Sequence, residues 1–546
     1  MSGSRGALAA VAATGALAAA GPALGIDMSQ RSPFLPPPDG SSAAQALAMA
    51  EQGRDLIVTV TGDRRAAPIL QGQRRLGERI WLVSGGHSSS VVRRLRAIGA
   101  LRYAHANGHM GSYGAYASQG DPEDPAPWWM PQIGADRVAA PGAGFPLTIV
   151  DDGIDRSHPE FASRPITFLN ENTMVPGEDF HGTMVSSVAG APVNGVGIAG
   201  LYPLVALRSA DTGAGDCADV LAAMEAAITA GPTIVNMSWG FSPPSCPALH
   251  DQIIRAVAGG ILPVAAAGNM RLHFSPPGVP AIWPHVLTVG STDPDGEVSI
   301  FSNEGMGIDL AAPGESMVVA APRFLYPSGY ANVEGTSFST SLVSAAAAWV
   351  ATRRGAKIRQ LADLLRSSAR DVAPAGWDAD TGYGILDIPS ALRKPLPAVD
   401  PLEPNDDMNQ VTVAGILKRE APALTRPGRA RATLRARLDR TEDPVDVYRV
   451  YVPARRQLRL RIAPTSNVDM ELFRPSARSC YYQNRSRALH GPLIGGRYGR
   501  GAAPETFPVR NADSTGKYLF ACVYKPRDTV SAASYTLSIT TVRLSR

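Results

Sequence analysis

The sequence of 546 residues is poor in cysteine, lysine and aromatic residues. Only 4 residues are cysteine, 6% are aromatic and 18% are charged, whereas 45% are apolar. Beyond residues 1–25 there is no run of about 18 apolar residues, which excludes a protein with several membrane spans. The high apolar content excludes a wholly disordered chain. The length indicates about three or four structural units.

The charge changes sign along the chain. Residues 1–120 contain 12 basic and 6 acidic residues (net +6), residues 121–397 contain 15 and 28 (net −13), and residues 398–546 contain 25 and 14 (net +11). An acidic middle between basic ends predicts separate domains. The basic C-terminal part either contacts a polyanion, such as an anionic cell-surface polymer, or is simply a solvated arginine-rich surface. No nucleic-acid-binding motif accompanies the charge, so we expect no nucleic-acid partner.

Residues 1–25 are typical of a secretory signal peptide. One arginine precedes a long Ala/Leu/Val stretch, and small residues follow at Ala18–Ala20. The alternative is an uncleaved anchor helix. Cleavage predicts a secreted or periplasmic protein with no membrane span once the signal is removed.

Residues 26–120 contain a small α+β unit. Strands are predicted at 55–62, 79–85 and 100–106, and a helix at 89–99. The Gly-, Ser-, Asp- and Pro-rich stretch at 107–127 predicts an exposed connector.

Residues 121–397 alternate between apolar strands and helices. Strands are predicted at 147–153, 233–240, 261–269 and 285–291, and helices at 181–190, 218–231, 247–259 and 337–353. This pattern predicts an α/β fold with a parallel sheet covered on both faces. Such sheets bind ligands at the carboxyl ends of their strands.

Residues 398–546 form a third unit. The Pro- and charge-rich stretch 393–407 predicts a domain linker crossed by few contacts. Period-2 alternation then appears at 445–453, 457–464, 468–475, 517–524 and 534–542. Short strands without helices predict an all-β sandwich.

Three segments of the middle unit place a reactive side chain beside small residues. Asp151 follows a buried strand, His181 opens a helix, and Ser337 opens another helix after a Gly-Thr turn. A serine is a weak nucleophile unless a base activates it, and the base needs an orienting carboxylate. Each residue alone also fits an ordinary cap or loop position.

The flanking residues resolve this ambiguity, because their order and context resemble those of the subtilisin-like serine proteases. The matching segments are 150–161, 181–187, 194–200, 235–240, 265–269, 301–305, 309–314 and 335–341. The resemblance covers about 270 residues. It implies the three-layer fold of that family with its parallel sheet.

The resemblance also implies roles for single residues. Ser337 is expected to attack the peptide carbonyl, His181 to act as its base, and Asp151 to orient His181. Asn269, together with the backbone N–H of Ser337, is expected to bind the oxyanion. The expected substrate-binding residues are Ser238, Trp239 and Gly240 on one side, and Ala266, Ala267 and Gly268 on the other. Asp152 stands where many relatives have Thr or Ser, but some family members, the kexin-like branch among them, also have Asp-Asp-Gly here.

Many proteins of this family bind structural calcium, although no cofactor is expected for the chemistry. Asp124, Glu160 and Asn194 match a plausible calcium site. A loop without metal is the alternative.

The resemblance to this family also suggests roles for the N-terminal and C-terminal units. The N-terminal unit is expected to be a prosegment that assists the protease, since its basic charge complements the acidic middle; a permanently attached domain is the alternative. The C-terminal unit resembles the bacterial pre-peptidase C-terminal domain at 402–407, 443–453, 467–475 and 516–524. A kexin-type jelly roll is the other candidate.

The four cysteines, Cys217, Cys246, Cys480 and Cys522, fall two in the middle unit and two in the last. Four cysteines allow three pairings, and pairing within each unit suits a secreted chain, with free buried thiols as the alternative.

The sequence therefore predicts a secreted serine endopeptidase that acts through an acyl-enzyme on protein or peptide substrates. A non-catalytic surface-binding protein and an esterase remain as alternatives. Labelling by an active-site serine probe distinguishes a working enzyme from the non-catalytic surface-binding protein.

Overall fold

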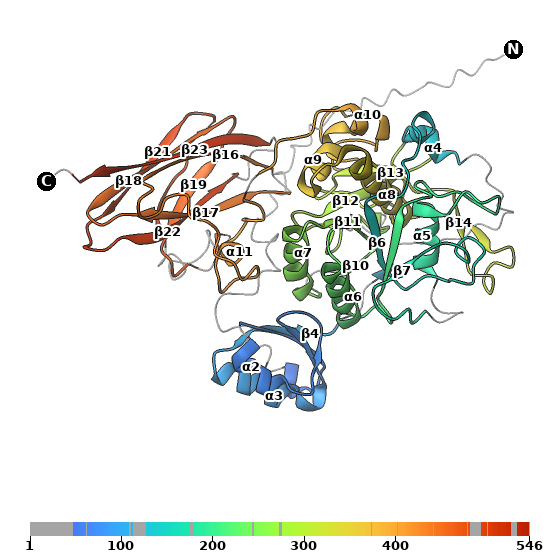
Figure 1. The fold of residues 1–546 in the computed structure, drawn as a ribbon, viewed down its shortest axis with the longest axis horizontal. Helices are drawn as coiled ribbons and strands as arrows, with labels where there is room; N and C mark the ends of the chain where they lie inside the picture. Colours follow the sequence, from blue (N-terminus) through green and yellow to red (C-terminus); the bar gives the residue numbers. More distant parts are fainter. Residues whose placement is uncertain are drawn as a thin grey trace, which may run out of the picture.

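The structure is a computed structural model of the whole chain. It describes residues 47–544 apart from 48, 62, 109–110, 113–126, 175–179, 243–244, 272–275, 373, 401, 440–441, 478, 481–492, 500 and 526–531. The predicted signal peptide and Asp124 therefore lie outside the described residues. Three units are visible in Figure 1: a small N-terminal unit, a central α/β unit and a C-terminal β unit, called the tail below.

The N-terminal unit has the predicted α+β class: it is a four-stranded antiparallel sheet with two helices, of which β2 and α2 were not predicted. The strand order is β2-β3-β1-β4. Its elements are β1 (Leu56–Val60), α2 (Asp63–Leu70), β2 (Arg74–Arg75), β3 (Ile80–Val83), α3 (Gly85–Ala97) and β4 (Leu101–Ala106). Strand β1 is buried on both faces, because alternate residues pack toward α2 and α3 and toward the central unit. The unit therefore has a core of its own and a second apolar contact with its neighbour.

The central unit is built on a seven-stranded parallel sheet. The strands, in spatial order, are β13 (Leu310–Pro313), β12 (Leu287–Thr292), β11 (Leu262–Ala266), β9 (Ile234–Met237), β6 (Pro146–Asp151), β8 (Ala206–Asp211) and β7 (Thr167–Phe168). All pairs within it are parallel. The predicted α/β class is confirmed, while β8, β13 and β7 were not predicted.

Helices cover both faces of this sheet. The helices are α4 (Trp129–Gln132), α5 (His181–Gly190), α6 (Cys217–Thr229), α7 (Ala248–Ala258), α8 (Thr336–Arg354), α9 (Ile358–Ser368) and α10 (Ile388–Arg393), with a 3-10 turn η1 (Ala135–Arg137). Helices α5 and α8 share one apolar core, and α6 and α7 share the other. The short strands β5 (Gly111–Ser112), β10 (Trp239–Gly240), β14 (Met317–Ala320) and β15 (Tyr330–Val333) lie outside the main sheet.

The tail has the predicted β-sandwich architecture, with two four-stranded antiparallel sheets, of which strands β16, β20 and β21 were not predicted. One sheet has the order β16-β23-β18-β21 and the other β17-β22-β19-β20. The elements are α11 (Met408–Val411), β16 (Arg431–Leu438), β17 (Val445–Val452), β18 (Arg456–Pro464), β19 (Asp469–Phe473), β20 (Leu493–Arg497), β21 (Glu505–Asn511), β22 (Lys517–Tyr524) and β23 (Ala533–Arg543). Alternate residues of β18 and β23 point into one apolar core.

The segment 393–407 differs from the predicted linker. Glu403, Asp406 and Asp407 are buried, and His285 Nε2 of the central unit lies 2.8 Å from Asp406 Oδ2. Ion pairs also join α9 to the tail, such as Arg366 with Glu442 at 3.4 Å. The expectation of few contacts across the linker is therefore wrong, because the acidic side chains of Glu403, Asp406 and Asp407 turn inward instead of facing solvent.

The structure pairs Cys217 with Cys246 and Cys480 with Cys522, which is the pairing within each unit that the sequence predicts. Among the helices of the described residues, none combines the length and the apolar content that a bilayer-spanning segment needs.

Candidate active site

Asp151, His181 and Ser337 are far apart in the sequence and meet at the carboxyl edge of the parallel sheet. Asp151 is the last residue of β6, His181 the first of α5, and Ser337 the second of α8. His181 Nδ1 lies 2.8 Å from Asp151 Oδ1, and His181 Nε2 lies 3.0 Å from Ser337 Oγ. The structure therefore brings together the three residues in the order carboxylate, imidazole, hydroxyl.

The imidazole of His181 lies in a buried and negatively charged environment. Burial lowers the pKa of His181, but the charge of Asp151 and its hydrogen bond outweigh burial, so the net pKa is raised. A base with a raised pKa accepts a proton from a hydroxyl more readily. This arrangement can pass a proton between Ser337 and His181 while Asp151 holds the ring.

Asp152 has a role that the sequence did not indicate. Its Oδ2 accepts hydrogen bonds from the backbone N–H groups of Phe180 (3.1 Å) and His181 (3.0 Å), and its Oδ1 accepts one from Gly182 (2.5 Å). Asp152 thus caps the first turn of α5, where backbone N–H groups lack helical partners. Burial, and then the charge of Asp151, raise the pKa of Asp152 to about 7.

Two glycines allow this close packing. A Cβ on Gly182 would lie 2.2 Å from the carbonyl oxygen of Gly153 and 3.0 Å from Asp152 Oδ1, so only glycine fits after His181. Gly335, before α8, has a φ of 151°, a conformation that other residues avoid. The small residues noted beside His181 and Ser337 are therefore required by the backbone.

Asn269 lies beside the N-terminus of α8. Its Oδ1 accepts hydrogen bonds from the backbone N–H (3.0 Å) and the hydroxyl (2.8 Å) of Thr336. Both hydrogen bonds of the Asn269 side chain seen among the described residues are made by Oδ1, which leaves its amide nitrogen to donate to a ligand. Thr336 fixes the direction of the amide, a role that its place before Ser337 did not reveal.

The predicted substrate-binding residues lie on both sides of Ser337. The Ser238 carbonyl accepts a 3.0 Å hydrogen bond from Ser337 Oγ, and its hydroxyl donates to the Ser337 carbonyl at 2.9 Å. Strand β10, Trp239–Gly240, pairs antiparallel with β5, Gly111–Ser112, of the predicted connector. Residues Ala266, Ala267 and Gly268 are buried at the end of β11. Chain from the connector thus occupies the edge where a substrate strand is expected.

The predicted calcium ligands are only partly described, since Asp124 lies outside the described residues. Glu160 Oε1 accepts hydrogen bonds from Ile198 N–H and Tyr330 OH, both at 2.9 Å. Asn194 Oδ1 accepts one from Val196 N–H at 3.0 Å. These oxygens are already engaged by the protein itself, and the calcium site stays a prediction.

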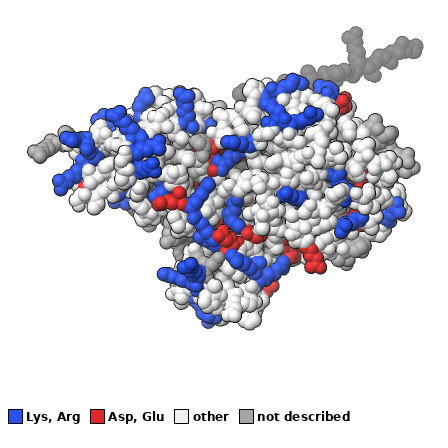
Figure 2. All heavy atoms as spheres, in the orientation of Figure 1, with Lys and Arg blue, Asp and Glu red and all other residues white. Residues whose placement is uncertain are grey.

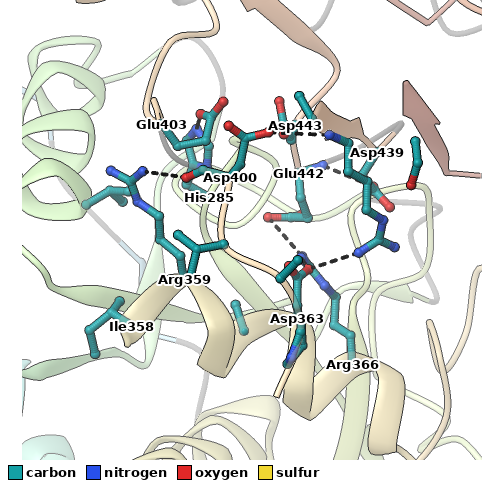
Figure 3. A pocket seen from close by; sticks show the side chains of 18 of the residues that line it. His285, Ile358, Arg359, Asp363, Arg366, Asp400, Glu403, Asp439, Glu442 and Asp443 are labelled. Carbon is teal, nitrogen blue, oxygen red and sulfur yellow. Dashed lines mark hydrogen bonds and ion pairs between the residues drawn. The ribbon is translucent and has the colours of Figure 1, made fainter. Parts of the chain in front are cut away.

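A second group of carboxylates, which the sequence analysis missed, lies between the central unit and the tail (Figure 3). We call it the interface cluster; its members are Asp400, Glu403, Asp406, Asp443 and Asp446. Ligand atoms of His285, Glu403 and Asp406 lie within 4.8 Å of one another, as do those of Asp400, Glu403, Asp443 and Asp446. The cluster adjoins a cavity of about 390 Å³. Its sequence signals were the segments 402–407 and 443–453, which contain Glu403, Asp406, Asp443 and Asp446.

Comparison with known proteins agrees with this geometry. The family model described as "Subtilase family" (Peptidase_S8) matches residues 142–384. The chain is 29% identical over 279 residues to "Subtilisin" of Bacillus pumilus, which covers 49% of this chain and 98% of that protein. It is 30% identical over 284 residues to "Subtilisin DY" of Bacillus licheniformis, covering 49% and 98%.

A solved structure shares the fold over a longer stretch. It is that of fervidolysin from Fervidobacterium pennivorans, which is 18% identical with a TM-score of 0.54 and covers 83% of this chain and 69% of that chain. The chain therefore belongs to the subtilase family and is a subtilisin-like serine peptidase.

Proposed function

We propose that this protein is a secreted serine endopeptidase that hydrolyses peptide bonds through an acyl-enzyme formed on Ser337. The observation that carries the proposal is the continuous hydrogen-bonded line from Asp151 through His181 to Ser337. Ser337 Oγ attacks the peptide carbonyl while His181 Nε2 takes its proton and passes it to the leaving amine. Asp151 keeps His181 in the tautomer that carries its proton on Nδ1, and it stabilises the imidazolium form of His181. Water then hydrolyses the ester: His181 takes a proton from the water and returns it to Ser337 Oγ.

The oxyanion of the tetrahedral intermediate is assigned to Asn269 and the backbone N–H of Ser337. The two hydrogen bonds with Thr336 hold Asn269 Oδ1, which directs the amide nitrogen away from Thr336. A preorganised donor of this kind stabilises charge that develops only in the transition state. The proposed substrate backbone pairs with Ser238–Gly240 and lies against Ala266–Gly268.

The central experiment compares Ser337→Ala with Ser339→Ala, which removes a second buried hydroxyl from the same helix. Ser337→Ala is expected to lose cleavage of a peptide library and labelling by a fluorophosphonate probe. Ser339→Ala is expected to keep both, since the Ser339 hydroxyl forms no hydrogen bond with any described residue. Cleavage by Ser337→Ala at the wild-type rate would exclude the proposed nucleophile.

The N-terminal unit is proposed to be the prosegment of this peptidase. Its sheet packs on α6 and α7 through Ile57, Leu76, Ile80 and Tyr103. Its end is anchored at the start of α6, where Asn107 Nδ2 donates to Asp216 at 2.8 Å and Asn107 Oδ1 accepts from Ala218 N–H at 2.9 Å. From there the connector reaches β10. This path supports a role in which the unit blocks the substrate edge until it is removed.

We propose structural calcium at the interface cluster as well as at the predicted site around Glu160. Glu403 Oε1, Asp406 Oδ1 and Asp443 Oδ1 are buried without a hydrogen-bond partner among the described residues. Calcium is coordinated by six to eight oxygens, several of them carboxylates, which this cluster can supply. The ion would stabilise the contact between the central unit and the tail and take no part in the chemistry.

The tail is proposed to be a pre-peptidase C-terminal type domain that binds an anionic cell-surface polymer. The outer face of the sheet β16-β23-β18-β21 carries Arg431, Arg435, Arg459, Arg461 and Arg510. The positions between them on this face are Ser, Thr, Gln, Ala, Pro or Val, apart from Arg437, and none is acidic. In Figure 2, Lys and Arg gather over the tail.

This face lacks aromatic side chains, on which the bases of single-stranded nucleic acids stack. A polysaccharide with acidic groups therefore fits the face better than a nucleic acid does. The test is retention of the whole protein on an anionic polysaccharide matrix. Replacing Arg459 and Arg461 by Ser should release the protein at lower salt, whereas replacing Arg353 and Arg370 on the central unit should not. Unchanged elution of the tail variant would contradict the assignment.

Secretion or export to the periplasm is proposed from residues 1–25 and is tested by fractionation.

A further inference from the structure

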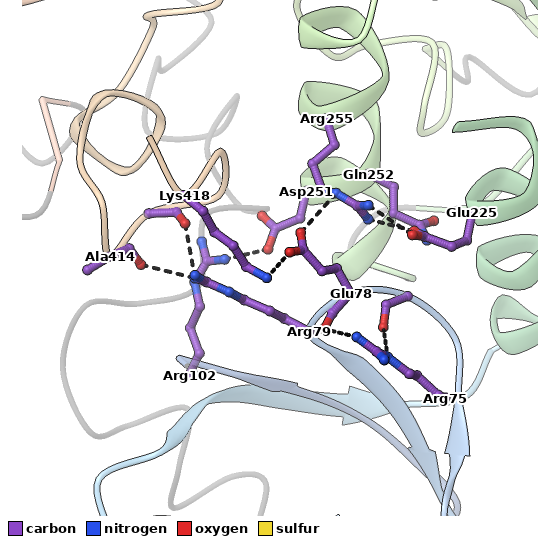
Figure 4. Close-up of polar contacts among 12 residues, drawn as sticks. Arg75, Glu78, Arg79, Arg102, Glu225, Asp251, Gln252, Arg255, Ala414 and Lys418 are labelled. Carbon is purple, nitrogen blue, oxygen red and sulfur yellow. Dashed lines mark hydrogen bonds and ion pairs between the residues drawn. The ribbon is translucent and has the colours of Figure 1, made fainter. Parts of the chain in front are cut away.

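The N-terminal unit contacts the tail as well as the central unit, at a junction where all three meet (Figure 4). The turn between β2 and β3, residues 77–79, lies between α7 of the central unit and residues 412–418 of the tail, which we call the tail loop. The tail loop begins directly after α11. More than 330 residues of sequence separate the two sides of this contact.

The contact between the N-terminal unit and the central unit is mainly apolar. Ile57, Leu76 and Ile80 belong to one core with side chains of α6 and α7. A Cβ on Gly77 would lie 3.1 Å from Glu225 Oε2, so the turn approaches α6 closely. Polar pairs join the same two units, among them the largely buried pair of Arg102 with Asp251 at 2.5 Å. Most of the affinity between these two units is therefore expected from buried apolar area.

The contact between the N-terminal unit and the tail is polar and charged. Arg79 Nη1 donates to the carbonyl oxygens of Ala414 (3.3 Å) and Gly415 (3.1 Å). The ammonium group of Lys418 forms an ion pair with Glu78. Glu78 also lies 3.9 Å from Arg255 of α7, and Arg255 in turn pairs with Glu225. One carboxylate of the N-terminal unit thus faces a cation from each of the other two units.

The tail loop is built to present these groups. Ile416 N–H donates to the Asn409 carbonyl at 2.6 Å, and Gly415 N–H donates to the Thr412 carbonyl at 3.0 Å. A Cβ on Gly415 would lie 1.6 Å from the Asn409 carbonyl oxygen, so the loop closes on α11 only with glycine at this position. Its own hydrogen bonds therefore hold the two acceptor carbonyls in place before Arg79 arrives. Such preorganisation lowers the entropic cost of the contact.

We propose that the tail loop is a second contact site that holds the N-terminal unit in place. Release of this unit then requires the tail contact to break as well as the apolar contact with α6 and α7. The inference rests on the proposed prosegment role, and it adds the tail as a partner of the prosegment. After the connector is cut, a tail that keeps this contact slows the departure of the unit and therefore the onset of activity. Because Lys418 and Glu78 are partly exposed, salt is expected to weaken the tail contact more than the apolar one.

The experiment uses the full chain carrying Ser337→Ala, so that no self-cleavage interferes. Hydrogen–deuterium exchange of β1 and β3 is measured with and without Lys418→Ala. Opening of the unit from its two neighbours is expected to become about two- to fivefold more frequent in this variant, as for loss of a partly exposed ion pair. Glu78→Gln should give an effect in the same direction from the other side of the pair. A double-mutant cycle isolates the coupling between the two residues.

Lys517→Ala is the matched control, because it removes a lysine of the same tail from an exposed 3.0 Å pair with Asp513 that does not touch the N-terminal unit. This control should leave exchange in β1 and β3 unchanged. Equal exchange in the Lys418→Ala and Lys517→Ala chains, with both tails folded by thermal melting, would overturn the proposal. The exchange readout needs no catalysis, so it stands or falls separately from the assignment of Ser337.

A second measurement uses the active full chain after processing. Co-elution of the cut N-terminal unit with the rest of the protein is followed by size exclusion at low and high salt. Lys418→Ala should shorten this association about two- to fivefold at low salt, and the difference should shrink at high salt. The same association time with and without Lys418 would also overturn the proposal.

Discussion

Two groups of buried carboxylates in this protein have opposite surroundings. Asp151 and Asp152, at the active site, face His181 and the first backbone N–H groups of α5. The interface cluster, between the central unit and the tail, mostly consists of carboxylates facing one another. His285 and the backbone and side chains around the cluster satisfy some of its oxygens and leave others without a partner in the described part of the chain.

The pKa values follow this difference at His181, although burial and the charge of Asp151 also raise the pKa of Asp152 to about 7. At the active site the negative charge is used to raise the pKa of His181. In the interface cluster, burial and then the neighbouring carboxylates raise the pKa of Glu403 and Asp443 well above the usual range. Burial, and then Asp400, also raise the pKa of Asp446 to about 7. Buried charge is stable where the chain supplies a partner, and elsewhere it must be neutralised by protons or by a cation.

The largest effect is expected from a substitution that disrupts the active-site carboxylates. Asp151→Asn should lower kcat by about 10⁴ while the fold survives, because the imidazole loses its orienting charge and takes the wrong tautomer. The measurement is peptide cleavage at saturating substrate. Asp155→Asn, a nearby carboxylate that only accepts hydrogen bonds from Ser157, is the matched control and should stay near the wild-type rate. A loss of less than tenfold for Asp151→Asn would refute its proposed role.

The second effect tests whether a cation completes the interface cluster. At pH 7.5, calcium at 100 times its dissociation constant should stabilise the protein by about 2.7 kcal/mol, and chelation should remove this gain. Thermal melting with and without chelator measures it. Glu403→Gln should reduce the response, since Glu403 belongs to both groups of ligand atoms. Glu304→Gln, an exposed carboxylate of the central unit, should keep it; an equal response in both variants would rule out a site at the cluster.

The third effect concerns pH in the absence of calcium. The raised folded-state pKa values mean that the folded cluster holds protons that the unfolded chain has already lost, so unfolding releases protons between about pH 4 and pH 7. Stability should therefore fall as pH rises through this window. The expected loss exceeds about 1.4 kcal/mol, the value of one pKa unit. Denaturant unfolding at pH 5 and pH 7.5 in chelator measures it, and greater stability at pH 7.5 would contradict the explanation.

The smallest effect concerns the cap of α5. Asp152→Ala should cost about 1 kcal/mol of stability, the usual value for a lost N-cap, because three backbone N–H groups lose their acceptor. Asp152→Asn keeps one acceptor oxygen and should cost less. Unfolding in denaturant measures both. If alanine and asparagine behave alike, the carboxylate does not act as a cap.

The strands and helices predicted from local patterns are present in all three units, because apolar periodicity depends on neighbours in the sequence, but elements such as α2, α9, β16 and β21 were not predicted. The strand before Asp151 and the helix after Ser337 are examples, and motif spacing led to the same family that the comparisons support. Strands β8 and β13 were missed. The apolar run that marks the other buried strands is interrupted in β8 by Arg208, Ser209 and Asp211.

The sequence by itself determined which residues can do chemistry, since nucleophile, base and carboxylate are properties of side chains. Only the tertiary structure decided their distances, the capping role of Asp152 and the burial of Glu403, Asp406 and Asp407. It also decided that Glu78 meets Lys418, 340 residues away. The physical reason is that these contacts join segments distant in the chain, and local composition carries no information on which distant group will compensate a buried charge. A Pro- and acid-rich segment looks the same in sequence whether solvent or another domain surrounds it.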